Sequence, residues 1–269
     1  ADQVATVRFG AAISAPTGLA KTGYVLAGWD KVLAGTMPAS DLTYTAQWTA
    51  RLFKITLDPT GGAPADQSLT VAYDSTYGTL PTATRTGYTF DGWFTAVTGG
   101  SQVLAADLMT IAADQTLYAH WTARTFQITF DSNGGIALAV NQLTVTYGSL
   151  YGDLPMPEKT GYTCSGWFTA KTGGGQILAT DPVAITEDLT VYAQWKANTY
   201  RVSFAGNGAT SGTMTDQSLR FDTAEKLQAN RYVRLGYLFA GWAASDTGPV
   251  LYTDQVSVVT LTAAANTTV

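Results

Sequence analysis

The single histidine and the single cysteine of the 269-residue chain are the first candidates for chemistry. His120 could act as a base near neutral pH and Cys164 as a nucleophile, provided that the two side chains meet. One thiol and one imidazole are too few ligands for a zinc or iron–sulfur site. These residues therefore allow at most one nucleophilic site, and we predict no metal and no cofactor.

Four aspartates are the second candidates, because each follows a tryptophan at a similar distance. They are Asp41, Asp107, Asp181 and Asp254. A hard cation would need several further oxygen ligands, but the nearby acids are not repeated, since Asp74 has Gly148 as its counterpart. The pattern favours an Asx turn or a cap, and a cation site remains the alternative.

An internal repeat organises these residues. Gly-Tyr is followed five residues later by Trp at Gly23-Tyr24/Trp29, Gly87-Tyr88/Trp93, Gly161-Tyr162/Trp167 and Gly236-Tyr237/Trp242. A second tryptophan column, Trp48, Trp121 and Trp195, has spacings of 73 and 74 residues. This period suits a small domain better than a solenoid unit. We predict four domains, named repeats 1 to 4, at residues 1–50, 51–123, 124–197 and 198–269.

The two outer repeats are predicted to be incomplete. Repeat 1 has no counterpart of the opening strand and Gly-Gly turn that repeats 2 and 3 carry, and it is short. Repeat 4 stops where the others continue into Tyr-Ala-x-Trp. The ends allow two explanations, a segment of a longer protein or subunits that complete one another head to tail.

Comparison of the repeats argues against catalysis. His120 occupies the column of Gln47 and Gln194, which predicts a strand surface position without a catalytic role. The column of Cys164 also contains Leu26, Phe90 and Phe239. We expect Cys164 to be a small buried hydrophobe with little thiolate character.

The periodicity within a repeat is that of strands. Residues 54–57 and 127–130 alternate, and a Gly-Gly turn then indicates a hairpin. In residues 88–93, Gly92 allows a bulge that would bring Trp93 onto the face of Phe90. We predict a mainly β fold, α+β at most.

The repeated aromatic residues allow two interpretations. As core, they would stabilise a domain too small to do without large side chains. We assign this role to Trp29, Trp48, Trp93, Trp121, Trp167, Trp195, Trp242, Tyr24, Tyr88, Tyr162 and Tyr237, together with Cys164. On an exposed face the same rings could stack on sugars, and the column of Trp48 could instead pack one repeat against the next.

Composition excludes several function classes. Charged residues make up only 13%, and the net charge of −5 offers no basic surface for nucleic acid. No apolar run approaches the roughly 20 residues of a transmembrane helix. The joints between repeats are short and contain no Gly, Ser or Pro, as in Thr122-Ala123-Arg124, so we predict an elongated, semi-rigid rod.

The motifs of repeat 3 carry a family resemblance. ITFDSNGG, VTYGSLYGDLPMPEKTGYTCSGWFTAKTGG and LTVYAQW resemble the Listeria–Bacteroides repeat, the B-repeat of internalin-type surface proteins. The resemblance implies β-grasp-like units that serve as a stalk, spacer or adhesive module in secreted or wall-anchored bacterial proteins. It supplies no catalytic residues.

The sequence thus predicts a noncatalytic extracellular protein attached to the cell surface or wall. Its function would be that of a stalk, an adhesin segment or a fibre subunit, and the alternative is a carbohydrate- or protein-binding module that uses exposed Tyr and Trp. The expected partners are other surface proteins, glycans or copies of the chain joined by head-to-tail strand exchange.

Overall fold

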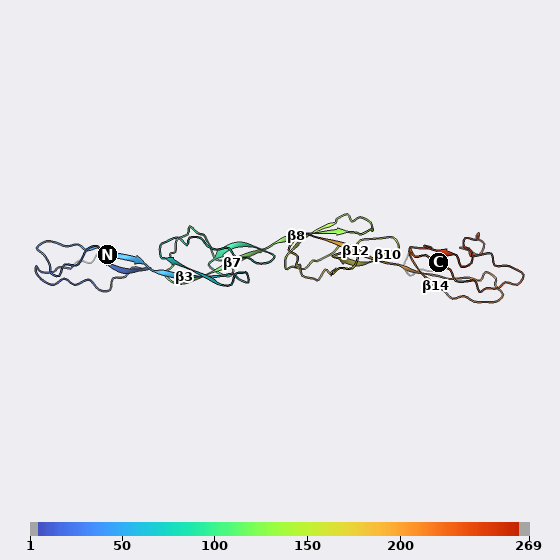
Figure 1. The fold of residues 1–269 in the computed structure, drawn as a ribbon, viewed down its shortest axis with the longest axis horizontal. Coiled ribbons are helices and arrows are strands. Elements are labelled where there is room, and N and C mark those ends of the chain that lie inside the picture. The colour runs from blue at the N-terminus through green and yellow to red at the C-terminus, as the bar shows by residue number, and fades with distance from the viewer. Residues whose placement is uncertain (1–4, 264–269) are drawn as a thin grey trace. The chain divides into compact units, whose positions relative to one another are not determined.

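The computed structural model describes residues 5–263 and builds them from strands and loops (Figure 1). No helix forms in this range, and so none of the length and hydropathy needed to cross a membrane is found there. The mainly β prediction is confirmed. The chain divides into two units, residues 1–124 and 125–269, and each is described by itself.

The described part of unit 1 contains two sheets, a two-stranded antiparallel one and a five-stranded mixed one. The two-stranded sheet pairs β1 (Tyr24–Trp29) with β2 (Ala46–Ala50). The five-stranded sheet has the order β4-β3-β7-β5-β6. Its strands are β3 (Leu52–Asp58), β4 (Gln67–Ala72), β5 (Tyr88–Phe94), β6 (Gln102–Val103) and β7 (Gln115–Ala123).

Unit 2 repeats the five-stranded arrangement, in the order β11-β10-β12-β8-β9. These strands are β8 (Thr125–Asp131), β9 (Gln142–Thr146), β10 (Tyr162–Phe168), β11 (Gln176–Ile177) and β12 (Leu189–Ala197). Two small antiparallel pairs follow in the described residues of repeat 4. They are β13 (Thr199–Val202) with β14 (Gln217–Arg220), and β15 (Glu225–Lys226) with β16 (Ser257–Val258).

The first strand of each five-stranded sheet lies inside the sheet, second from one edge. β3 pairs antiparallel with β4 on one side and parallel with β7 on the other, and β8 does the same with β9 and β12. Strand alternation buries Ile55 and Leu57 on one face, at 0% and 1% exposure. A parallel pair needs a long crossover, and here the loops and the three intervening strands, β4 to β6 in unit 1, supply it without a helix. The finer β-grasp assignment stays a prediction.

The predicted bulge at Gly92 is present. The register of β5 against β7 shifts between Phe90 and Gly92, where Gly92 has a φ of 124°. The extra residue turns Trp93 onto the face of Phe90, and the two rings meet edge to face with centroids 5.5 Å apart. Gly166 produces the same shift in β10.

Each five-stranded sheet has its own apolar core. In unit 1 it includes Met109 and Leu117, both fully buried, and in unit 2 it includes Val183 and Val191. By contrast, none of the buried apolar side chains belongs to residues 5–50. A two-stranded ribbon without further strands has little surface to bury against, which explains the difference. The repeat boundaries and the rod shape stay predictions, and residues 1–4 and 264–269 of the outer repeats lie outside the described range.

Candidate functional site at the repeat junctions

His120 lies on strand β7, where its ring contacts Phe94 and the Ala96 carbonyl. Its ring stacks on Phe94 with centroids 3.9 Å apart, and its Nε2 lies 2.9 Å from the Ala96 carbonyl oxygen. In repeat 3, Gln194 Nε2 donates to the equivalent carbonyl, that of Ala170, at 3.1 Å. The imidazole of His120 and the amide of Gln194 therefore make equivalent contacts, which hold the loop after β5 in repeat 2 and after β10 in repeat 3.

We expect His120→Gln to change the free energy of unfolding by no more than about 0.5 kcal/mol, because Gln194 makes the same contact in repeat 3. Urea titrations of the two proteins at pH 7.5 would measure the difference. A loss several times larger would show that the imidazole has a role that the glutamine of repeat 3 does not share.

The aspartate column separates into three kinds of position. Asp107 and Asp181 cap turns, since each accepts a hydrogen bond from the backbone N–H three residues earlier, at 2.8 and 2.9 Å. Asp254 instead accepts from the Asn230 N–H at 2.8 Å. The turn prediction is therefore confirmed for Asp107 and Asp181.

The placement of Asp41 in that column is wrong. Asp41 stands seven residues before Trp48, as Asp114 does before Trp121, and so belongs to the column of Asp114. Fewer residues separate Trp29 from Trp48 in repeat 1 than separate Trp93 from Trp121 in repeat 2, so the number of residues from Trp29 to Asp41 is misleading. Within residues 5–263, no three His, Cys, Asp or Glu side chains gather as a metal site would require.

Cys164 is half-buried on β10 and packs against the core of unit 2. Its Sγ lies 3.4 Å from the Gly166 N–H, across the bulge. The side chain thus occupies an apolar position, less buried than the sequence column suggested. His120 and Cys164 lie in different units, and among residues 5–263 neither is brought to a catalytic partner within its own unit.

Two tryptophans of the first column are core residues. Trp93 and Trp167 are 4% and 3% exposed. Each indole N–H donates to a proline carbonyl in the connection before the strand, Pro81 at 2.6 Å and Pro155 at 2.8 Å. These bonds fix the long connection over the sheet while the rings fill the core.

The other two members of that column are half-buried. Trp29 meets Tyr44 edge to face with ring centroids 6.4 Å apart. Trp242 packs on Phe204 at 4.7 Å, and its buried Nε1 has no hydrogen-bond partner. Repeat 4 has Asn230 where the other two have the accepting prolines, and its side chain is bonded to Tyr232 instead.

The second tryptophan column packs within its own repeat. Trp121 is half-buried beside Phe90 and donates to the Pro59 carbonyl at 3.0 Å. A Cβ on Gly62 would lie 2.5 Å from the Trp121 ring, so the glycine is required by close approach. Trp195 and Gly135 repeat this contact, at 2.6 Å. The second glycine of the Gly-Gly turn thus packs directly against the tryptophan ring in repeats 2 and 3. In repeat 1, Trp48 is half-buried without such a contact among the described residues.

A joint connects repeats 1 and 2 within unit 1. The Arg51 N–H donates to the Gly23 carbonyl at 2.8 Å, and the Arg51 carbonyl accepts from the Tyr73 N–H at 2.9 Å. The Tyr24 and Tyr73 rings meet edge to face at 5.5 Å, and the Tyr24 hydroxyl donates to Asp74 at 2.8 Å. The Tyr73 ring covers Gly23 so closely that a Cβ there would lie 2.2 Å from it.

The joint between repeats 3 and 4, within unit 2, has the same construction. Asn198 takes the place of Arg51. Its N–H donates to the Gly161 carbonyl at 2.9 Å, and its carbonyl accepts from the Phe221 N–H at 2.8 Å. Tyr162 meets the Phe221 ring at 5.5 Å and donates to Asp222 at 2.8 Å. A Cβ on Gly161 would again lie 2.2 Å from the covering ring.

The joints explain the tyrosine of the Gly-Tyr motif. Tyr24 and Tyr162 are half-buried joint residues, and each has a lysine ammonium over its ring, at 3.8 and 4.3 Å. Tyr88 is half-buried, with the Arg85 guanidinium 4.1 Å from its ring centroid. Tyr237 is 65% exposed and lies in no core. The core role predicted for Tyr24 and Tyr162 misses their contact with the following repeat.

The hydrogen bond to Asp222 raises the pKa of Tyr162, and burial and the charge of Asp222 act in the same direction. The neutral phenol is therefore the form that the joint favours. The contribution of this bond is present below the unfolded tyrosine pKa of about 10 and is lost as the pH rises through the raised pKa in the folded protein.

We therefore expect Tyr162→Phe to destabilise the protein at pH 8 and to have a smaller effect at about pH 11, above the usual tyrosine pKa. Denaturant midpoints of wild type and variant at the two pH values would measure this. Taking the difference between the two proteins removes the titration of the other tyrosines. An equal effect at both pH values would contradict the proposed role of the phenol proton.

Comparison with known proteins agrees with this repeating construction. The model of the Listeria-Bacteroides repeat domain matches residues 1–49, 53–120, 126–194 and 200–269. The chain belongs to this family. The resemblance drawn from the motifs of repeat 3 is thereby confirmed, and it covers nearly the whole chain.

Three relatives are longer than the chain. A protein of Evansella cellulosilytica named as a Gly-rich membrane protein is 26% identical over 249 residues, covering 83% of this chain and 28% of the relative. A second protein of that organism, named as a membrane protein, is 25% identical over 254 residues, covering 89% of this chain and 37% of the relative. Internalin H of Listeria monocytogenes is 42% identical over 120 residues, covering 44% of this chain and 21% of the relative. The chain thus spans a minor part of each.

The sequence interpretation did not identify Tyr73 and Phe221, the residues of the following repeat that contact Tyr24 and Tyr162. Tyr73 and Phe221 end alternating stretches and read as the last residues of strands. The available signal was an aromatic residue followed by Asp74 or Asp222, both of which have positive φ, at 61° and 58°. That pair marks a turn that presents the ring outward.

Proposed function

We propose that the chain is a noncatalytic spacer segment of a bacterial surface protein, in which joined repeats hold other parts at a distance. The observation that carries the proposal is the backbone bonding of Arg51 and Asn198, the first residues of repeats 2 and 4, to the preceding repeat as well as to their own. The residues at these domain boundaries are thus held by hydrogen bonds on both sides, which a flexible tether does not need. Attachment to the cell surface is supported by the names of the relatives.

The placement of aromatic side chains favours a spacer over a sugar-binding module. Stacking on a sugar needs exposed, coplanar rings. All seven tryptophans are buried or half-buried, and the Trp93 and Trp167 indoles donate to carbonyls of their own repeats. Adhesion to a glycan would therefore need another feature of the surface.

A distance measurement tests the spacer. Spin labels would be placed at Val32 and Val97, which are 93% and 53% exposed in repeats 1 and 2, in a Cys164→Ala background. The proposal expects a narrow distance distribution in a double electron–electron resonance experiment. A matched pair of labels at Val97 and Leu104, within repeat 2, gives the width of a rigid reference. A distribution between repeats as broad as that of a flexible linker would refute the spacer.

A further inference from the structure

The first and last strands of repeats 2 and 3 are parallel neighbours. In repeat 2, β3 pairs with β7 from Ile55 and Gln115 to Asp58 and Tyr118, and β8 pairs with β12 in the same way in repeat 3. The chain enters repeat 2 through β3 and leaves it through β7. We propose that this strand pair is a mechanical clamp, by which repeats 2 and 3 resist unfolding when the chain is pulled lengthwise. The inference goes beyond the spacer function, which needs stiffness but no resistance to tension.

Tension reaches the two strands of repeat 2 from opposite ends. Because β3 and β7 run in the same direction, a pull on the start of β3 and the end of β7 slides the strands past each other. The evenly spaced hydrogen bonds of a parallel ladder then share the load. A pull across the strands would instead open the ladder one bond at a time. The topology therefore places the bonds between β3 and β7 under shear.

Neither of these strands lies at an edge of its sheet. β3 is held between β4 and β7, and β7 is held between β3 and β5. Their core-facing side chains Ile55, Leu57 and Leu117 are 0%, 1% and 0% exposed. Sliding either strand would therefore pull close-packed side chains out of the core while the ladder bonds break.

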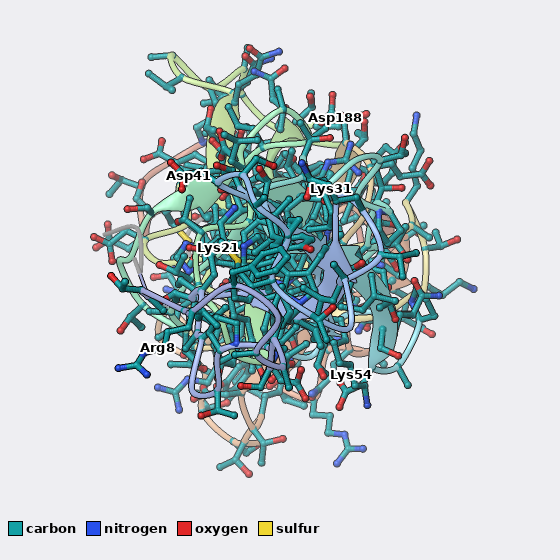
Figure 2. The ribbon with its side chains drawn as sticks, turned by 90° about the vertical axis from the view of Figure 1, so that its left-hand side faces the viewer. Arg8, Lys21, Lys31, Asp41, Lys54 and Asp188 are labelled. Atoms are coloured by element: carbon teal, nitrogen blue, oxygen red, sulfur yellow. The ribbon has the colours of Figure 1, made fainter. Side chains whose placement is uncertain are left out.

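A side-chain hydrogen bond extends the ladder at its N-terminal end. The Lys54 N–H, one residue before the paired part of β3, donates to Asp114 Oδ1 at 2.8 Å. In repeat 3, the Gln127 N–H donates to Asp188 Oδ1 at 2.8 Å. Figure 2 labels Lys54 and Asp188, one residue from each of these bonds. The aspartate adds one more bond between the first strand and the segment that begins the last strand.

Two further side-chain bonds extend the ladder at its C-terminal end in repeat 2. The Trp121 indole donates to the Pro59 carbonyl at 3.0 Å, and the Thr60 hydroxyl donates to the Ala119 carbonyl. Both bonds join the turn after β3 to strand β7.

Repeat 3 keeps these two bonds with different side chains. Trp195 donates to the Ser132 carbonyl at 3.0 Å, and the Asn133 amide replaces the Thr60 hydroxyl by donating to the Ala193 carbonyl at 2.9 Å. A hydroxyl and an amide thus make the same link. The contact between turn and last strand is therefore common to both repeats, although the donor residue differs.

Pulling the full chain in two directions tests the clamp. Cysteines for the DNA handles of optical tweezers would replace Leu52 and Thr122, both exposed, in a Cys164→Ala background, so that only repeat 2 is loaded in shear. The comparison keeps Leu52→Cys and moves the second handle to the exposed Ala113, at the same end of the ladder as Leu52. We expect the unfolding force at one loading rate to be at least about twofold higher in shear, because several bonds must then break together.

A pair of aspartate variants tests the contribution of the ladder end. In the shear geometry, Asp114→Ala should raise the unfolding rate at a given force about three- to tenfold, since it removes a hydrogen bond between the loaded strands. Asp107→Ala is the matched control, because Asp107 accepts from the Leu104 N–H, also at 2.8 Å, within the loop after β6. It should change that rate by less than about twofold.

Equal unfolding forces in the two pulling directions would overturn the clamp, and so would equal effects of Asp114→Ala and Asp107→Ala. The comparison of directions uses the same fold with one handle moved, so it does not depend on the stability of either aspartate variant. The spacer function is tested separately by the label distances. A broad distance distribution together with a high shear force would refute the spacer and retain the clamp.

Discussion

Replacing Trp167 by alanine is expected to lower the free energy of unfolding of the unit 2 sheet by about 3–5 kcal/mol. The ring is 3% exposed and lies 4.8 Å from Phe130, centroid to centroid. Its removal leaves a cavity in a core that also contains Val183 and Val191, and it frees the Pro155 carbonyl from its hydrogen bond. Urea unfolding of the full chain, followed by hydrogen exchange of the β10 and β12 amides, would locate the loss.

Two further variants separate the causes. Trp167→Phe keeps a six-membered aromatic ring but removes the indole donor and part of the buried ring volume, so we expect a cost of about 1–2 kcal/mol. Val140→Ala, at a position that is 71% exposed in the same repeat, should change stability by no more than about 0.5 kcal/mol. If Trp167→Ala cost no more than Val140→Ala, the assignment of this column to the core would be wrong.

Local patterns predicted local structure well. The alternation of residues 54–57 and 127–130 lies in strands β3 and β8, because one face of each strand is buried. The bulge at Gly92 followed from one glycine between Phe90 and Trp93. In each case the residues that carry the sequence pattern lie within a few residues of the structural feature that they predict.

Contacts between distant segments were not predictable. Trp121 packs on the turn at Gly62, and Asp114 caps the β3 backbone at Lys54. About sixty residues separate the two members of each pair, and each residue by itself is typical of a turn or a strand end. Only the fold, which places the last strand parallel to the first, brings them together.

The repeat also misled where its copies differ in length. The distance of Asp41 from Trp29 matches that of the aspartate column, although Asp41 lies in the loop that leads into β2, the strand of Trp48. Tyr237 shares the motif of Tyr162 but is 65% exposed, and no described aromatic ring packs on it as Phe221 packs on Tyr162. A shared motif therefore specifies the capacity for a contact, and the neighbouring repeat decides whether the contact forms.

The second large effect is expected for Gly161→Ala at the joint of repeats 3 and 4. The new Cβ would lie 2.2–2.3 Å from three atoms of the Phe221 ring, so the ring must leave its position over the glycine. Overpacking of this kind costs about 1–3 kcal/mol, and the φ of 78° adds about 1–2 kcal/mol for a residue with a side chain. The Phe221 N–H, which donates to the Asn198 carbonyl, should then exchange faster with solvent.

Gly236→Ala is the matched control, because Gly236 precedes Tyr237 in the same motif and has a φ of 81°, but no atom lies within 4 Å of an added Cβ. Both variants carry the backbone strain, and only Gly161→Ala displaces a ring. The difference between their unfolding free energies therefore isolates the joint, and we expect it to be about 1–3 kcal/mol. Equal losses, with unchanged exchange at Phe221, would mean that the aromatic contact does not couple the two repeats. In that case the backbone bonds of Asn198 alone would have to hold the spacer together.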